Sequence, residues 1–361
     1  MNTQPSPLSE PSSDTEATAA PPWPEVRPIA NPALELMVQH QLSGSHESEH
    51  AFGRMETLAI QLAGIQHLDG QGMEGLRFES PQLVVFAADH GIAVEGVSAF
   101  PQDATLQRAL ELLTGKSPVC ALASTQGFAV TLVDAGVATH IALPPDAAPA
   151  VPLLLRKIGY GTRNMVLAQA MSVAQMRAAI DAGMDVVKHL PGNVIALSNI
   201  SVGGNSSAAQ LLSRLCGVPL ADACGRHQAQ DEVRAQRKLE RLFAAASRHR
   251  KATAALDVLA CMGGFEIAMI CGAMIQAASE HRVVLVDGFV ASAAALVARA
   301  LVPAVADYLV FAHRSAEPGH RLLLIHLQAA PLLDMELRTG QGVGALLAWP
   351  LLLSAQRLLD R

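Results

Sequence analysis

The segment LVVFAADHG (83–91) decides the fold, because its short apolar run ends in Asp-His-Gly. This pattern is typical of a buried parallel strand, since both faces of such a strand are covered and its carboxyl end opens into a loop. The pattern returns at FAVTLVDAG (128–136), NVIALSNISVGG (193–204), RVVLVDGF (282–289) and VADYLVFAH (305–313). Helical stretches lie between these segments. The alternation predicts an α/β fold, a Rossmann-like parallel sheet with flanking helices and a ligand cleft at its carboxyl edge.

The N-terminal part of the chain has a different composition. Residues 1–30 are rich in Pro, Ser and Thr and lack the charged start and apolar core of a signal peptide. We therefore expect a disordered tail there. The following stretch predicts helix, because Met55, Leu58 and Leu62 recur at helical spacing. A helical appendage should precede the sheet.

Composition and charge narrow the class of partner. The chain has 361 residues, 50% of them hydrophobic, and a net charge of −6. An acidic balance argues against nucleic acid or an anionic membrane surface as the partner. The longest apolar runs, such as Val343 to Ala355, reach about a dozen residues, against the roughly 20 of a spanning helix. We expect a soluble, cytoplasmic protein whose partners are small molecules or proteins.

Neither a metal nor a redox cofactor is predicted. The five cysteines have no C-x-x-C spacing, which is typical of reduced thiols. HESEH (46–50) places two histidines at i and i+4, but it lacks the H-E-x-x-H order and a third ligand.

Polar residues follow the first predicted strand. Asp89 and His90 stand at its end, and Ser98 and Gln102 lie in the loop that comes next. At the carboxyl edge of a sheet, such groups either line a pocket or cap the turn. The residues alone leave both interpretations open.

A second polar stretch, SVGGNSSAAQLL (201–212), is suited to an anion. Gly204 lets the backbone approach a ligand, Asn205, Ser206 and Ser207 supply donors, and the helix that follows points its positive end at the site. A phosphate would fit there. No Gly-Lys-Ser/Thr follows and G-x-G-x-x-G is absent, which disfavours an NTPase or a dinucleotide enzyme. The alternative is a capping turn without a ligand.

The segment FAHRSAEPGH (311–320) concentrates polar chemistry in an apolar chain. Its charged and polar members are His313, Arg314, Ser315, Glu317 and His320. This density predicts a functional loop, and a solvated turn is the alternative. Glycines also precede helices near Glu266 and after Asp287, where either tight packing or a pocket floor would use them.

Together these segments resemble the nicotinate-nucleotide:5,6-dimethylbenzimidazole phosphoribosyltransferase family, which makes α-ribazole phosphate for the lower ligand of cobalamin. The resemblance runs in order from Asn31 to Arg361. It is strongest in AADHGIAVEGVSAFPQDAT, KIGYGTRNM, DVLACMGGFEIA, VVLVDGFVASAAAL, DYLVFAHRSAEPGH and PLLDMELRTGQGVGALLAWPLL.

The resemblance implies a large α/β domain over residues 76–330. It also implies a small helical domain from both chain ends: helices over 31–75, then an active-site loop and C-terminal helix over 331–361. The implied reaction moves 5-phosphoribose from nicotinate mononucleotide to 5,6-dimethylbenzimidazole, without a cofactor or a metal. The implied assembly is a homodimer, and a heterodimer with a homologue is the alternative, because heteromeric pairs exist in the family.

Site residues carry over by position. Ser98 and Gln102, in the same block as Asp89 and His90, match the loop beside the benzimidazole. The nucleotide side is matched by Gly204, Asn205, Ser206, Ser207, Lys238 and Ser315.

The chain departs from the family at its carboxylates. The family's catalytic Glu falls on Gln341, and a second family Glu falls on Ile200. The Gly-Arg-Gly-Thr-Gly loop near the nicotinate is replaced by Gly225 to Ala229. A Gln side chain orients a ring by hydrogen bonds but does not take up a proton near neutral pH.

Three hypotheses follow from these departures. The first is a working phosphoribosyltransferase in which Gln341 orients the base and another carboxylate or water takes the proton. The second is a degenerate paralogue that binds nucleotide or base and serves as a partner subunit. The third is an enzyme with a different acceptor, such as a purine or a phenolic base.

Overall fold

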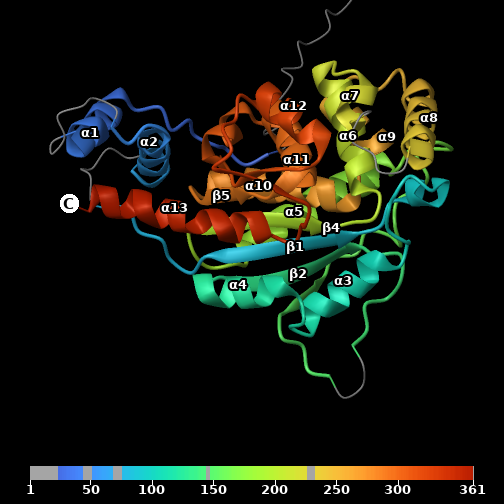
Figure 1. Ribbon diagram of the computed structural model, residues 1–361, viewed down its shortest axis with the longest axis horizontal. Helices are drawn as coiled ribbons and strands as arrows, with labels where there is room; N and C mark the ends of the chain where they lie inside the picture. The colour runs from blue at the N-terminus through green and yellow to red at the C-terminus, as the bar shows by residue number, and fades with distance from the viewer. Residues whose placement is uncertain (1–22, 44–50, 68–74, 144–146, 226–231, 361) are drawn as a thin grey trace, which may run out of the picture.

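The computed structural model describes residues 23–43, 51–67, 75–143, 147–225 and 232–360. A six-stranded parallel sheet forms its centre (Figure 1), in the order β3-β2-β1-β4-β5-β6. The strands are β1 (Gln82–Ala88), β2 (Ala129–Gly136), β3 (Leu153–Leu155), β4 (Val194–Ile200), β5 (Val283–Val286) and β6 (Leu309–Phe311). The predicted α/β fold with a parallel sheet is confirmed. The edge strand β3 was not predicted, because three residues are too few to show a pattern.

The strand order reverses between β1 and β4. The chain first builds outward through β2 to β3 and then returns to pair β4 with the other side of β1. In an open parallel sheet, such a reversal leaves a crevice beyond the carboxyl ends of the two central strands. The polar loops predicted to follow these strands therefore meet at one place.

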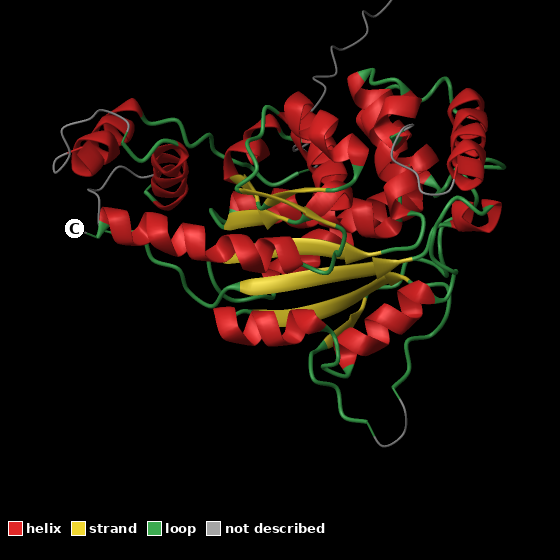
Figure 2. Ribbon diagram, viewed as in Figure 1, coloured by secondary structure: helices red, strands yellow, loops and turns green. Residues whose placement is uncertain are grey.

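Helices cover both faces of the sheet (Figure 2). One face carries α3 (Ala104–Leu113) and α4 (Pro118–Gln126), and the other carries α5 (Val173–Lys188), α10 (Phe265–Ser279) and α11 (Gly288–Leu301). Helices α5 and α10 approach very closely: a Cβ added at Gly183 would overlap Met269 O, and one added at Gly272 would overlap Ile180 O. The abundance of small residues thus serves tight helix packing.

Most of the remaining helices surround the carboxyl edge of the sheet or join the two chain ends. Near the edge lie η1 (Gly91–Glu95), α6 (Gly204–Cys216), α7 (Leu220–Cys224), α8 (Glu232–Arg248), α9 (Ala255–Met262) and α12 (Pro318–Leu327), whereas η2 (Pro303–Tyr308) leads into β6 at the opposite, amino edge. Helices α1 (Pro32–Ser43), α2 (Arg54–Gln66) and α13 (Val343–Leu359) contact one another (Figure 1). The two ends of the chain therefore share one helical group.

Two short segments add detail that the sequence did not predict. Strands β7 (His313–Ser315) and β8 (Leu333–Leu337) form a separate parallel pair.

The predicted disorder does not extend over residues 23–30, since Val26 is buried and the Ile29 amide donates to Asp307. Residues 1–22 and the HESEH segment (46–50) lie outside the described part. Among the described residues, no helix is long and apolar enough to cross a membrane.

Candidate functional site

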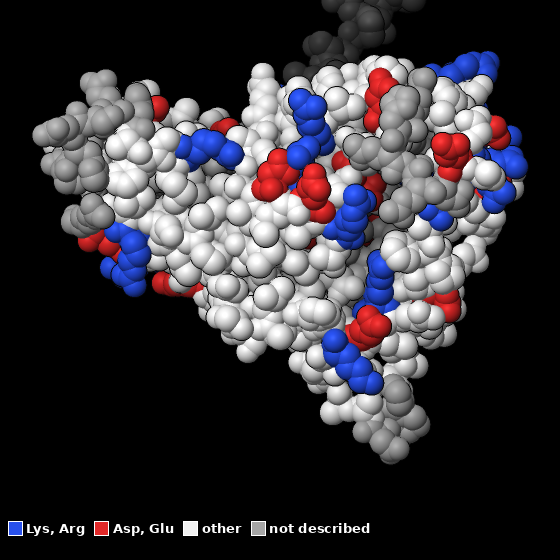
Figure 3. All heavy atoms as spheres, in the orientation of Figure 1, with Lys and Arg blue, Asp and Glu red and all other residues white. Residues whose placement is uncertain are grey.

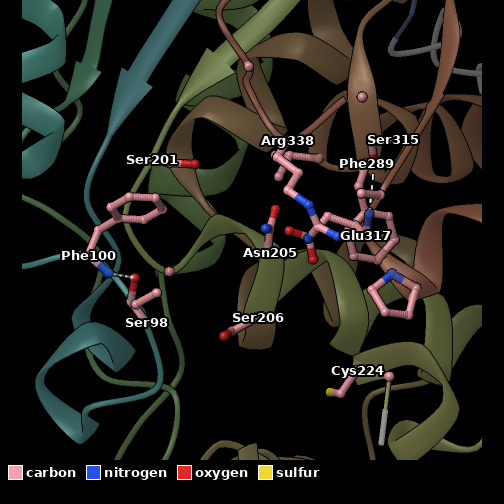
Figure 4. Close-up of a pocket in the computed structure, with 18 of the residues that line it drawn as sticks. Ser98, Phe100, Ser201, Asn205, Ser206, Cys224, Phe289, Ser315, Glu317 and Arg338 are labelled. Carbon is pink, nitrogen blue, oxygen red and sulfur yellow. Dashed lines mark hydrogen bonds between the residues drawn. The ribbon is translucent and has the colours of Figure 1, made fainter. Parts of the chain in front are cut away.

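A cavity of about 830 Å³ opens at the carboxyl edge of the sheet (Figure 4). Its walls come from the loops after β1, β4, β5 and β6, from α8 and from the loop before α13. This is the crevice at the reversal of strand order, and its size suits a small-molecule ligand. The predicted site residues that line it are Ser98, Asn205, Ser206, Lys238, Ser315 and Gln341.

The amino end of α6 faces this cavity. Gly203 has a φ of 92°, a left-handed conformation that lets the chain turn sharply into the helix. A Cβ added at Gly204 would overlap Ser201 Oγ, so any larger residue there would have to displace that side chain. Asn205 and Ser206 then line the cavity, as does Lys238 of α8. Free helix amides and an ammonium group together are suited to a phosphate.

A buried hydrogen-bonded chain supports that turn from behind. His90 Nε2 lies 2.6 Å from Glu266 Oε1, and His90 Nδ1 lies 2.9 Å from Ser207 Oγ. All three side chains are almost completely buried. Asp89 precedes this chain, accepts a hydrogen bond from the Ala138 amide, and has its pKa raised by burial. These polar residues thus support the cavity wall without lining it.

His320 fixes the orientation of Ser315. Burial lowers the pKa of His320 to about 3, so its ring is neutral. Its Nδ1 accepts a hydrogen bond from the Ser315 amide at 2.9 Å, which leaves the proton on Nε2, 3.1 Å from Ser292 Oγ. Ser315 Oγ also lies 2.9 Å from Nδ1 and donates its proton there, because Nδ1 carries none. Ser315 Oγ also accepts the Glu317 amide at 3.4 Å, which leaves one lone pair available to a ligand in the cavity.

The carboxylate of Asp287 holds the loop before α13 against the sheet by hydrogen bonds. Asp287 follows β5, and its carboxylate accepts hydrogen bonds from Ser198 Oγ at 2.8 Å and from the amides of Gly342 at 2.9 Å and Ala345 at 3.1 Å. His313 Nδ1 lies 3.5 Å from the same carboxylate. The sequence marked Asp287 only as part of a packing or floor pattern, because its partners lie far along the chain.

Gln341 lies at the end of this loop before α13. Its φ is 67°, and its Oε1 accepts a hydrogen bond from Ser117 Oγ at 2.7 Å. Ser117 caps α4, on the sheet face opposite to α10. Nothing in the sequence indicated this contact, since 224 positions separate the two residues.

The comparisons with known proteins agree with this architecture. A family model described as phosphoribosyltransferase matches residues 28–361. The chain belongs to that phosphoribosyltransferase family. The resemblance seen in the sequence is confirmed, because curated relatives that carry the name nicotinate-nucleotide–dimethylbenzimidazole phosphoribosyltransferase cover most of the chain.

Two curated relatives and one solved structure illustrate the similarity. The relative from Variovorax paradoxus (strain S110) is 44% identical over 93% of this chain and 93% of its own. The relative from Cupriavidus taiwanensis is also 44% identical, over 94% of this chain and 95% of its own. The crystal structure of CobT from Thermus thermophilus matches with a TM-score of 0.82 and 32% identity, over 91% of this chain and 96% of that one.

The structure of this phosphoribosyltransferase separates the predicted site residues into two groups. Ser98 lines the cavity, and its Oγ accepts the Phe100 amide at 3.1 Å (Figure 4). Gln102, in contrast, is exposed on the turn before α3 and is not part of the cavity wall. Asp89, His90, Gly204 and Ser207 lie behind the wall. Of the altered Gly225 to Ala229 stretch, only Gly225 is described, and it lines the cavity.

The charged groups around the cavity are mixed in sign. Lys238 and Arg338 line it together with the carboxylates of Asp287 and Glu317. On the face shown in Figure 3, the described Lys, Arg, Asp and Glu side chains are interspersed over a largely uncharged surface. No cluster of three or more His, Cys, Asp or Glu side chains with metal-binding geometry occurs among the described residues.

Proposed function

We propose that this phosphoribosyltransferase transfers 5-phosphoribose from nicotinate mononucleotide to 5,6-dimethylbenzimidazole, giving α-ribazole 5′-phosphate and nicotinate. One observation supports the proposal: a single cavity is lined by Asn205 and Ser206 at the amino end of α6 and also by Ser98 and Gln341. The names of the relatives specify the same two substrates. A nucleotide and a base therefore fit together in one site.

The nucleotide occupies the side formed by α6 and α8. Its phosphate accepts hydrogen bonds from the α6 terminus and from the side chains of Asn205 and Ser206, and it pairs with Lys238. The Ser315 hydroxyl, whose own proton is directed to His320, accepts a hydrogen bond from a ribose hydroxyl. Gly204 contributes its backbone, whereas Ser207, whose amide donates to Gly203 O and whose hydroxyl contacts His90, supports the turn from behind.

The base occupies the side formed by Ser98 and Gln341, with Gln102 at the outer rim and Asp89 and His90 supporting the wall. A base nitrogen attacks the anomeric carbon from the face opposite to nicotinate, and the new C–N bond forms as the old one breaks with inversion. The bonding electrons pass to the ring nitrogen of the cationic nicotinate, which leaves. Positioning two substrates in line supplies most of the rate, and the base N–H proton is lost to water.

Nicotinate release tests this proposal. Purified protein with both substrates should release nicotinate and form α-ribazole phosphate in equal amounts, measured by chromatography and mass spectrometry. Gln341→Glu restores a proton acceptor and should raise kcat by about 100-fold or more, since general bases contribute roughly 10²- to 10⁴-fold. Saturable binding of nicotinate mononucleotide without turnover, in both proteins, would refute the transferase and favour a binding subunit.

A pair of variants on α8 tests the nucleotide side. Lys238→Ala should raise the KM for nicotinate mononucleotide about tenfold or more, because a charge-assisted contact contributes about 1.5 to 3 kcal/mol. The neighbouring Arg237 is exposed and is not part of the cavity wall, so Arg237→Ala is the matched control and should leave KM unchanged. Equal effects of the two changes would contradict the proposed phosphate position.

The assembly and location belong to the same proposal. We expect a cytoplasmic homodimer. The alternative, suggested by the carboxylates that this chain has replaced, is a heterodimer with a homologue that retains them. Light scattering of the purified chain distinguishes the two assemblies. If the chain forms a stable dimer by itself, the homodimer is supported. A monomer that gains activity only on mixing with a homologue supports the heterodimer.

A further inference from the structure

The hydrogen bond between Ser117 and Gln341 fixes which end of the Gln341 carboxamide faces the cavity. Ser117 is 4% exposed and caps α4, and its Oγ accepts the Val119 amide at 3.4 Å. The hydroxyl proton is therefore free to be donated, and it goes to Gln341 Oε1 at 2.7 Å. The carboxamide oxygen is already used at this contact.

The other end of the carboxamide carries two N–H donors. Gln341 lines the cavity, and its Nε2 makes no hydrogen bond among the described residues. Nε2 is also not among the buried polar atoms that lack a partner, so it is open to solvent or a ligand. The cavity wall at this position thus presents a hydrogen-bond donor, whereas a glutamate would present only acceptors.

Gln341 is held at its side chain and at the peptide that follows it. Ser117 fixes Oε1, and Asp287 accepts the amide of Gly342, the next residue in the chain. A Cβ added at Gly342 would overlap Leu83, so the backbone there lies directly on the sheet. With the carboxamide turned over, Nε2 would donate to Ser117 Oγ, which already accepts the Val119 amide, and the Ser117 hydroxyl proton would lose its acceptor. The orientation with Oε1 on Ser117 is therefore favoured.

We propose that Gln341 is a specificity-determining residue that selects an acceptor base with a lone pair on the edge facing it. The inference rests on the proposed function and specifies its substrate class. The ring N–H of a benzimidazole faces the position where a glutamate would accept its proton. In this chain that ring N–H instead faces the N–H group of Gln341 Nε2. A ring with an additional nitrogen beside that N–H, as in a purine or 4-azabenzimidazole, instead accepts a hydrogen bond from Nε2.

Three bases that differ by one ring atom test the inference. 4-Azabenzimidazole replaces a single CH of benzimidazole by the nitrogen that Gln341 would contact. 5-Azabenzimidazole carries the same nitrogen one position further away and controls for the change in ring basicity. The wild-type kcat/KM for 4-azabenzimidazole should exceed that for 5-azabenzimidazole about twofold to tenfold, the range expected for one neutral hydrogen bond.

Variants at both ends of the hydrogen bond make the test specific. Gln341→Glu should reverse the preference, because its carboxylate repels the added lone pair. Ser117→Ala frees the carboxamide to turn over and should bring the ratio close to one, while Ser117→Thr keeps the hydroxyl and should keep the ratio. An unchanged ratio in Gln341→Glu, or a wild-type preference for 5-azabenzimidazole, would overturn the inference.

The readouts separate this inference from the proposed function. Calorimetric Kd values for the same three bases, measured with nicotinate mononucleotide present, report the preference without turnover. If no base releases nicotinate but the order of Kd values holds, the transferase proposal fails and the donor assignment stands. If nicotinate is released equally with all three bases, the transferase stands and the donor assignment fails.

Discussion

Lowering the pH from 8 to 5 should destabilise the fold by about 2 kcal/mol through one imidazole, that of His320. This ring is fully buried and neutral, and its Nδ1 accepts the Ser315 amide. Burial is the main cause that lowers its pKa from 6.5 to about 3, and electrostatic interactions with His313 and Arg314 lower it further. A proton therefore binds the unfolded chain long before it binds the native one.

The sign and size follow from that difference. Above pH 6.5 neither state binds the proton, so the contribution of His320 to stability is fully present. Between pH 6.5 and pH 3 the unfolded state is protonated and the native state is not, so stability falls by about 1.36 kcal/mol for each pH unit. At pH 5, about 1.5 pH units below 6.5, the loss is about 2 kcal/mol.

Urea unfolding at pH 8 and pH 5 measures this loss. His320→Asn places a carboxamide oxygen near the position of Nδ1 and does not titrate, so its free energy of unfolding should fall about 2 kcal/mol less than that of the wild type. His326 is exposed on the same helix, and His326→Asn is the matched control that should retain the wild-type difference. If His320→Asn loses as much stability as the wild type, His320 is not the group responsible.

Three further substitutions test the contacts around the cavity, each by urea unfolding. Asp287→Asn removes one acceptor from the start of α13. It should lower the free energy of unfolding by about 1.5 to 3 kcal/mol, and nicotinate release should fall with it. An unchanged free energy of unfolding would contradict the role of Asp287 in holding this loop. Gly344→Ala pushes a methyl group into His313 and should cost about 1 to 3 kcal/mol, and a neutral result would show that the helix start shifts freely. Glu266→Leu leaves the buried His90 without its partner and should lower the free energy of unfolding by about 3 to 5 kcal/mol. Glu266→Gln should lower it clearly less. Equal losses in the two variants would argue against a charged pair.

The sequence predicts the centre of the fold well, because the information there is local. The apolar run before Asp89 ends where β1 ends, and the glycines at 203 and 204 begin α6 as expected. Strand β3 escaped prediction, since its residues are partly exposed and it has only three of them. Pattern thus identifies an element when the element is long enough to repeat.

The site is harder to predict because its contacts join distant parts of the chain. Ser207 and His90 both follow strands, yet their side chains turn inward to each other rather than to the cavity. The position of Gln341 was evident from its motif, whereas the orientation of its carboxamide depends on Ser117. Local sequence identifies the residue types at the edge, and only tertiary contacts determine which atoms face a ligand.

The long-range contacts of the cavity also bear on how the chain folds. The pairs His90–Glu266, Ser117–Gln341 and Asp287–Gly342 are separated by 176, 224 and 55 positions. Contacts between such distant residues close large loops, so the cavity is complete only when segments from both halves of the chain are in place. Substrate then binds the completed fold alone, and at 100 times its Kd it stabilises that fold by about 2.7 kcal/mol. Supply of substrate in the cell thereby helps to set how much folded protein persists.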